Sequence, residues 1–195
     1  MARYLLAAKD DEILLPVGSG IGGGLNSLGG YSDSDWAGDK KTRKSASCAV
    51  LMINNCTAAV IVRGQGAIAQ SSAEAEVYAA AMTISELSHL QEVLGWLGVP
   101  MRMRLRCDSA ACRSIIQRQG VGRARHLSTK VLWLQSMTAS GRLVVEKVAG
   151  AENPADLGTK PLDANTHECH RELLSFKSVA PGRTAGRICS ARALL

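Results

Sequence analysis

The chain has 195 residues, of which 46% are hydrophobic, and this is enough to enclose one substantial core. Its formal charge is +6 and its isoelectric point is near 9.2, so a polyanionic partner is compatible with the composition but not required by it. The six cysteines form no CxxC pair, no secretory leader precedes them, and no apolar run reaches the roughly 18 residues of a membrane span. We therefore expect one soluble intracellular domain, cytoplasmic, nuclear or both, with reduced thiols and no membrane partner.

The first part of the chain is expected to contribute little to the core. Residues 1–15 have weak helical character, and Pro16 is followed by the glycine-rich run GSGIGGGLNSLGG, which is typical of a flexible connector. Folded structure is expected to begin near Leu28.

Three strands are predicted next. Two short apolar runs, 48–53 and 57–62, are separated by Asn54-Asn55, a pattern that predicts an antiparallel hairpin. The segment through Asp33 lies close enough in sequence to add a third strand, so the folded part is expected to open as a meander.

Residues 71–97 predict the main helix of the core. Ser71 and Glu74 have the spacing of a capping box, in which the serine hydroxyl and the glutamate each accept a free amide at the helix start. At about 100° per residue, Glu76 lies roughly 200° around the axis from Glu74, on the core side. The apolar positions recur at helical spacing: Val77, Ala80, Ala81, Ile84, Leu87, Leu90, Leu94 and Leu97.

The second half of the chain alternates strands and helices. Residues 101–108 alternate strictly between apolar and charged side chains, which predicts a strand that ends at Asp108. Ser109 can cap a short helix, and the apolar spacing over 127–140 predicts another helix. A strand over 142–148 and a short helix that begins near Pro154 and carries Asp156 complete the pattern. Residues 176–195 have no period and are expected to form a mobile tail.

This order of elements predicts an α/β fold. Three strands, a helix, a strand, two helices, a strand and a helix require a parallel pair beside an antiparallel meander. We expect a mixed five-stranded sheet, three antiparallel strands followed by parallel additions, flanked by helices.

Four carboxylates lie at the ends of predicted elements, where side chains from distant segments can converge. Like charges at close range raise each other's pKa, so four such groups need a cation to remain ionised together. Magnesium prefers oxygen ligands and is commonly completed by substrate phosphate. Two such ions about 3.5 to 4 Å apart would activate a water and stabilise the leaving oxygen of a phosphodiester. The candidate ligands are Asp33, Glu76, Asp108 and Asp156.

Four motifs in this order resemble the ribonuclease H domain of copia-type LTR retrotransposon Pol polyproteins. They are YSDSDWAGDKKTRKS, SSAEAEVYA, RCDSAA and ENPADLGTKPL. The resemblance covers residues 3–162 and starts with RYLLAAKD, which looks like the end of a reverse transcriptase connection. It implies a ribonuclease H-like fold and three parts: residues 1–27 as connection and linker, 28–162 as the ribonuclease H-like domain, and 163–195 as a C-terminal helix and tail.

The resemblance also implies catalytic residues, cofactors and partners. The catalytic and metal-binding quartet carries over to Asp33, Glu76, Asp108 and Asp156, with Asp35 as the reserve candidate for the first position. The implied activity is hydrolysis of the RNA strand of RNA/DNA hybrids by two Mg²⁺ ions, with Mn²⁺ as an alternative. The implied partners are the hybrid and the reverse transcriptase and integrase portions of the same polyprotein.

Basic residues near two motifs are candidates for contact with the nucleic acid, since hybrid recognition needs phosphate contacts and access to 2′-hydroxyls. The alternative for the KKTRK run is a solvated turn, and for His126 a surface or helix-cap position. HECH (167–170) is expected to contain ordinary helix residues rather than zinc ligands. The candidate nucleic-acid ligands are Lys40, Lys41, Arg43, Lys44, Arg123 and Arg125.

Two other functions remain open from the sequence. The chain could be a catalytically inactive, ribonuclease H-like remnant that binds nucleic acid, in which case changes to the quartet would cost little. Integrase-like DNA strand transfer is the second alternative, and it would require processing of DNA ends without a need for hybrid.

Overall fold

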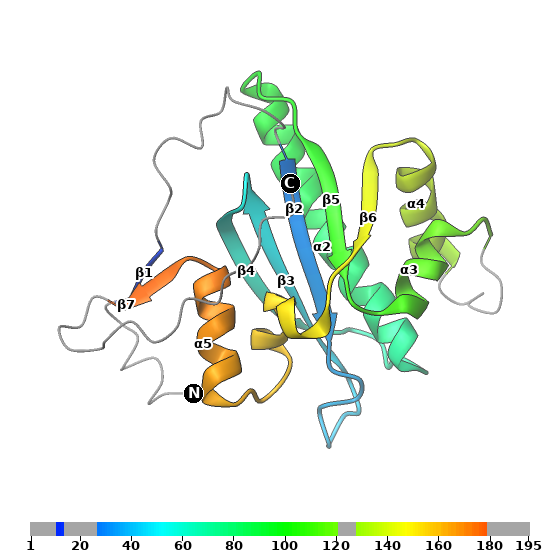
Figure 1. Cartoon of the computed structure of the whole chain (residues 1–195). Coiled ribbons are helices and arrows are strands. Elements are labelled where there is room, and N and C mark those ends of the chain that lie inside the picture. The colour runs from blue at the N-terminus through cyan, green and yellow to red at the C-terminus, as the bar shows by residue number, and fades with distance from the viewer. Residues whose placement is uncertain (1–10, 14–26, 121–127, 179–195) are drawn as a thin grey trace.

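The computed structural model describes residues 11–13, 27–120 and 128–178, and a mixed sheet of five strands lies at its centre (Figure 1). The strand order is β4-β3-β2-β5-β6. The pairs β2–β3 and β3–β4 are antiparallel, whereas β2–β5 and β5–β6 are parallel. The predicted fold class is therefore confirmed. The strands are β2 Ser27–Ser34, β3 Ala46–Ile53, β4 Cys56–Gly64, β5 Arg102–Cys107 and β6 Leu143–Lys147.

The helices follow the predicted order. The main helix, α2, is capped by the Ser71 hydroxyl, which accepts the Glu74 amide, and Ser109 caps α3 through the Cys112 amide. Two short 3₁₀ helices lie between β6 and α5, and the second of them carries Asp156. The helices are α2 Ser72–Trp96, α3 Ala110–Gln117, α4 Ser128–Ala139, η2 Gly150–Glu152, η3 Pro154–Gly158 and α5 Ala164–Leu173.

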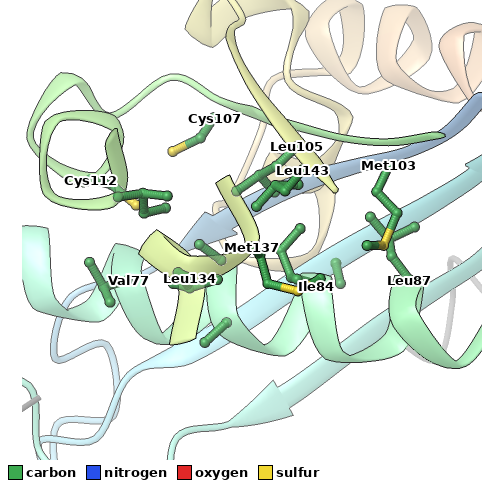
Figure 2. Packing of buried hydrophobic residues seen from close by; sticks show 14 of the residues in the cluster. Val77, Ile84, Leu87, Met103, Leu105, Cys107, Cys112, Leu134, Met137 and Leu143 are labelled. Atoms are coloured by element: carbon green, nitrogen blue, oxygen red, sulfur yellow. The ribbon is translucent and has the colours of Figure 1, made fainter. Parts of the chain in front are cut away.

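Apolar clusters cover both faces of the sheet. Strand β3 contributes to both clusters, because successive side chains of a strand point to opposite faces. Ala49 and Leu51 belong to the larger cluster, in which α2 packs against β2, β3 and β5 and is joined by α3 and α4. Figure 2 shows Val77, Ile84 and Leu87 of α2 within this cluster. On the other face, a smaller cluster includes Ala155 of η3. Strand β2, which carries Asp33, thus lies between a helix layer and η3.

Two glycines permit close approach of these layers to the sheet. A Cβ on Gly30 of β2 would lie 2.6 Å from Thr83 Cγ2 and 2.8 Å from Leu87 Cδ1 of α2. A Cβ on Gly158 of η3 would lie 2.6 Å from the Cys48 sulfur of β3. Only a residue without a side chain fits at either position, so the two glycines set how closely α2 and η3 approach the sheet.

Two predictions about the ends of the chain are wrong. Asp11–Ile13, within the segment expected to be weakly helical, forms strand β1. It pairs antiparallel with β7, Phe176–Ser178, at the start of the expected mobile tail. Backbone pairing between segments more than 160 positions apart leaves no local pattern in either of them, which is why the sequence did not indicate it.

The glutamate of the predicted capping box also contacts the chain before the cap. Glu74 Oε2 accepts the amide of Gln70 at 2.8 Å. Glu74 is 5% exposed, so the glutamate stabilises the helix start from a buried position.

Several predicted features lie outside the described residues. They include residues 18–26 of the glycine-rich run, Arg123, Arg125, His126 and most of the tail. The last residues of that run, 27–30, are described and begin β2 instead of forming a connector. The proposed division into three parts stays a prediction. Among the helices that are described, none combines the length and the apolar character needed to cross a membrane.

Candidate active site

The carboxylates of Asp33 and Asp156 share one lysine. Asp33 is 1% exposed at the end of β2, and Asp156 is 8% exposed in η3. Lys160 Nζ lies 3.1 Å from Asp33 Oδ1 and 2.8 Å from Asp156 Oδ1. The Thr159 hydroxyl donates to the other oxygen of Asp33, Oδ2. These four residues form the first half of the site, and we call them the lysine-bridged half.

Asn153 fixes the loop that carries Asp156. Its side chain is fully buried, and Nδ2 donates to the Ser32 carbonyl of β2 at 3.1 Å. Its Oδ1 accepts the Ala155 amide at 3.3 Å, as a cap of η3, and Pro154 is suited to the first helical position that follows. The amide side chain therefore joins η3 to the strand next to Asp33.

Glu76 and Asp108 form the second half of the site, together with Cys107. The possible ligand atoms of these three residues all lie within 4.8 Å of one another. Glu76 comes from the first turn of α2, and Cys107 and Asp108 come from the end of β5. We call them the open half, because no ion pair joins either carboxylate to a basic side chain in the part of the chain that is described.

Two contacts show that the halves adjoin. The Ser34 hydroxyl, one residue after Asp33, donates to Glu76 Oε1 at 3.1 Å. Gly150, in the loop that leads to Asp156, lies so close to the other strand end that a Cβ there would be 3.5 Å from Asp108 Oδ2. The structure therefore brings all four predicted carboxylates together at one end of the sheet.

The electrostatics of the carboxylates reflect burial and mutual repulsion. Burial, with the neighbouring charges of Asp33, Cys107 and Asp108, raises the pKa of Glu76 to about 8. Burial and the Asp156 charge likewise raise the pKa of Asp33, although Thr159 and Lys160 oppose the shift. Burial disfavours the charge of Lys160, but its contacts with Asp156 and Asp33 outweigh this cost and raise the lysine pKa.

The donor set of the open half fits a divalent cation. Glu76 Oε2 is buried and has no hydrogen-bond partner among the described residues, so one carboxylate oxygen has an unsatisfied acceptor. Glu76 and Asp108 supply the oxygen ligands that Mg²⁺ prefers, with Asp33 on the adjoining strand. The Cys107 sulfur beside them is a softer donor, which suits Mn²⁺ less than it suits zinc.

Asp35 does not take part in the site. Strand β2 ends at Ser34, and Asp35 Oδ1 accepts the Ala46 amide, which fixes the turn between β2 and β3. Of the two aspartates in SDSD, the structure therefore places Asp33 with the other carboxylates.

The KKTRK run forms an exposed turn between β2 and β3, beyond the same end of the sheet (Figure 1). Asp39 organises it: Oδ1 accepts the Lys41 amide at 2.8 Å, and the Asp39 carbonyl accepts the Arg43 amide at 2.7 Å. Lys40, Lys41, Arg43 and Lys44 are all exposed there. The turn is solvated, as the alternative interpretation expected, and it also extends from the strand that carries Asp33.

The arginines of β5 and the histidine of the HECH run have structural partners. Arg104 and Arg106 both pair with Glu146 across β5 and β6, and Arg106 also contacts the ring of Tyr31. His170 of the HECH run is buried, with Nε2 3.1 Å from the Ala151 carbonyl, and belongs to no metal-ligand cluster among the described residues.

Sequence reasoning missed three residues of the site: Thr159, Lys160 and Asn153. The signal for Lys160 was its spacing of four residues from Asp156, just past the end of η3, which brings the two side chains together. Its contact with Asp33 spans 127 positions and had no local signal. Cys107 was recognised only as a strand residue.

Comparisons with known proteins give relatives among transposon polyproteins, whereas no family model matches the chain. The chain is 31% identical over 178 residues to the retrovirus-related Pol polyprotein from transposon TNT 1-94 of Nicotiana tabacum. It is 26% identical over 182 residues to the polyprotein from transposon RE1 of Arabidopsis thaliana. These matches cover 90% and 92% of this chain. The chain spans only 13% and 12% of the two polyproteins.

Solved structures similar to this one are ribonucleases H. LC11-RNase H1, isolated from compost, matches with a TM-score of 0.51 at 20% identity, over 68% of this chain and 91% of that one. The same protein in complex with an RNA/DNA hybrid matches with a TM-score of 0.50 at 18% identity, over 68% and 93%. The N-terminal RNase H domain of a Mycobacterium tuberculosis protein matches with a TM-score of 0.52 at 14% identity, over 75% and 97%.

The structural matches establish the fold, and the sequence matches place the chain beside one segment of longer polyproteins. The chain therefore has a ribonuclease H-like fold and is similar over most of its length to a segment of retrovirus-related Pol polyproteins from transposons.

Proposed function

We propose that the chain is a hydrolase that cleaves the RNA strand of RNA/DNA hybrids. The observation that carries this proposal is the convergence of Asp33, Glu76, Asp108 and Asp156 at one end of the sheet, from four separate segments. Carboxylates crowded in this way are stabilised by divalent cations, and we infer two Mg²⁺ ions, with Mn²⁺ as an alternative.

Each carboxylate has a position that suits this chemistry. Glu76 and Asp108 would hold one ion, and Asp156 would contribute to the other. Asp33, which shares Lys160 with Asp156, would join it at the second ion, and it adjoins the first through Ser34 and Glu76. Bound ions of this kind activate a water and stabilise the leaving oxygen of a phosphodiester. Asn153 would hold η3, and with it Asp156, in register with β2.

The substrate class is supported by the ribonuclease H relatives, one of which has been solved with an RNA/DNA hybrid. The exposed turn of Lys40, Lys41, Arg43 and Lys44 would contact phosphates beside the site. Because the relatives are Pol polyproteins, we infer that the domain acts in reverse transcription, alongside reverse transcriptase and integrase portions of a longer chain.

The direct test is cleavage of a labelled RNA/DNA hybrid with Mg²⁺, by the chain and by its Asp108→Asn variant. We expect cleavage of the RNA strand by the chain, and a loss of about 100-fold or more in the variant, because even groups that support metal ligands cost 10- to 100-fold when changed.

Three outcomes would contradict the proposal. Hybrid binding without cleavage would indicate an inactive remnant. Processing of DNA ends without hybrid would indicate strand transfer. Undiminished cleavage by Asp108→Asn would show that the activity does not come from this site.

A further inference from the structure

The motif ADLGTKPL extends past Asp156, and its next polar residues turn back onto the site. Lys160 lies four residues after Asp156, and its amide donates to the Asp156 carbonyl at 2.9 Å. The backbone of η3 therefore fixes where the lysine stem begins. From that point Nζ contacts Asp156 Oδ1 at 2.8 Å and Asp33 Oδ1 at 3.1 Å.

We propose that Lys160 is an internal cation that competes with the second divalent ion for the carboxylates of Asp33 and Asp156. The proposal rests on the proposed function, because that function requires two ions. It adds a specific consequence: the two ions bind in unequal steps, and the second binds only as the Lys160 ammonium leaves the position between the two aspartates.

The burial of the three partners supports displacement. The Asp33 side chain is 1% exposed and the Asp156 side chain 11%, so their charges need a cation nearby. The Lys160 side chain is 41% exposed and has a flexible four-carbon stem. The ammonium can therefore swing into water, whereas the two carboxylates cannot. Thr159 remains hydrogen-bonded to the far oxygen of Asp33 and leaves Oδ1 available to a cation.

The open half provides the contrast that makes the steps unequal. Glu76 and Asp108 have no ion-pair partner within residues 27–120 and 128–178, and the buried Oε2 of Glu76 accepts no hydrogen bond there. An ion that binds at this half displaces no protein cation. We therefore assign the first, tighter step to Glu76 and Asp108 and the second, weaker step to Asp33 and Asp156.

The experiment is a titration of the EDTA-treated full chain with Mn²⁺, in which free Mn²⁺ is followed by its EPR signal. Mg²⁺ calorimetry gives a parallel measurement, and no nucleic acid is present. For Lys160→Met we expect the dissociation constant of the second ion to fall about tenfold, the order of effect of removing one partly solvated charge from two carboxylates. The dissociation constant of the first ion should change by less than about twofold.

Matched variants separate competition from a general effect of charge. Lys160→Arg retains the cation and should retain the weak second step. Lys147→Met removes an exposed lysine from the end of β6 without touching either aspartate, and should change neither step by more than about twofold. Circular dichroism checks that each variant is folded, and Lys160→Gln replaces Lys160→Met if the latter is not.

The inference would be overturned by a second step that is unchanged or lost in the folded variant, Lys160→Met or its replacement Lys160→Gln, or by binding of no ion to the chain. The hybrid-cleavage assay reports separately on the proposed function. A chain that shows the expected Mn²⁺ pattern but cleaves no hybrid would lose the proposed activity and keep the internal cation. A chain that cleaves hybrid but lacks the expected Mn²⁺ pattern would support the proposed activity and contradict the role of Lys160 as an internal cation.

Discussion

The two halves of the site contain the same kind of side chain in different electrostatic surroundings. Asp33 and Asp156 share the ammonium of Lys160, and Asp33 also accepts the Thr159 hydroxyl. Among the residues that the structure describes, Glu76 accepts only the Ser34 hydroxyl, and burial with its acidic neighbours raises its pKa to about 8. In the first half the protein supplies its own cation, Lys160, whereas the charges of the second half depend on a cation from solution.

The largest expected effect comes from removing one carboxylate from each half. We expect Asp108→Asn and Asp156→Asn each to reduce hybrid cleavage by about 100-fold or more. Their response to Mg²⁺ should differ. At an ion concentration tenfold above the dissociation constant, binding stabilises a folded protein by about 1.4 kcal/mol. Asp156→Asn should retain this stabilisation and Asp108→Asn should lose it, as measured by urea unfolding with and without Mg²⁺.

Glu152→Gln is the matched control for this pair, because Glu152 is an exposed carboxylate in the same loop. It should leave both cleavage and the Mg²⁺ response unchanged. Equal loss of the Mg²⁺ response in both aspartate variants would show that the halves bind ions as one unit and would end the distinction between them.

A second prediction concerns pH and the open half. Glu76 has a pKa of about 8 in the folded chain and about 4.5 when unfolded. Between these values the unfolded chain has already lost the proton that the folded chain retains, so stability falls as pH rises. The loss is complete above the folded pKa and is expected to be on the order of a few kcal/mol. Urea unfolding of the EDTA-treated chain at pH 5 and pH 8.5 measures it.

Glu76→Gln removes this titration and should therefore lose less stability over the same range. Glu92→Gln, at an exposed position of the same helix, should follow the unmodified chain. Parallel curves for the chain and Glu76→Gln would contradict the account of Glu76 as a buried charge without a protein cation.

The smallest expected effect concerns the exposed turn. Replacing Lys41 and Lys44 by alanine should weaken hybrid binding a few-fold, and should reduce the salt dependence by about one unit of slope for each lost phosphate contact. Arg142→Ala, at the start of β6 and so at the opposite end of the sheet, is the control. Fluorescence anisotropy over a range of salt concentrations measures both quantities, and equal slopes for the two variants would remove the turn from the proposed interface.

The fold could largely be predicted, because its elements have local signals. Alternation over 101–108 predicted β5, and the apolar spacing after Ser71 predicted α2 and the inward orientation of Glu76. Asp108 and Asp156 were located by the ends of their own elements. Each of these inferences depends on residues fewer than about 10 positions apart, which is the range over which periodicity is informative.

The remaining features depend on contacts between distant segments. The contact of Lys160 with Asp33 and the hydrogen bond from Asn153 to Ser32 span 127 and 121 positions, and β1 pairs with β7 across the whole described chain. No pattern within either partner indicates such contacts. The ends of the predicted elements and the resemblance indicated the same quartet, but neither showed that one half of the site contains its own cation.

The tight fit at Gly30 and Gly158 means that the geometry of the chemistry is set partly by atoms that take no part in it. One glycine determines how near α2, with Glu76, lies to the sheet, and the other does so for η3, with Asp156. A methyl group at Gly30 would push α2 and Glu76 away from the sheet, and one at Gly158 would push η3 and Asp156 away. Either change would move a carboxylate relative to the others without removing any charge. Few substitutions should therefore be tolerated at Gly30 and Gly158, although neither residue has a polar side chain.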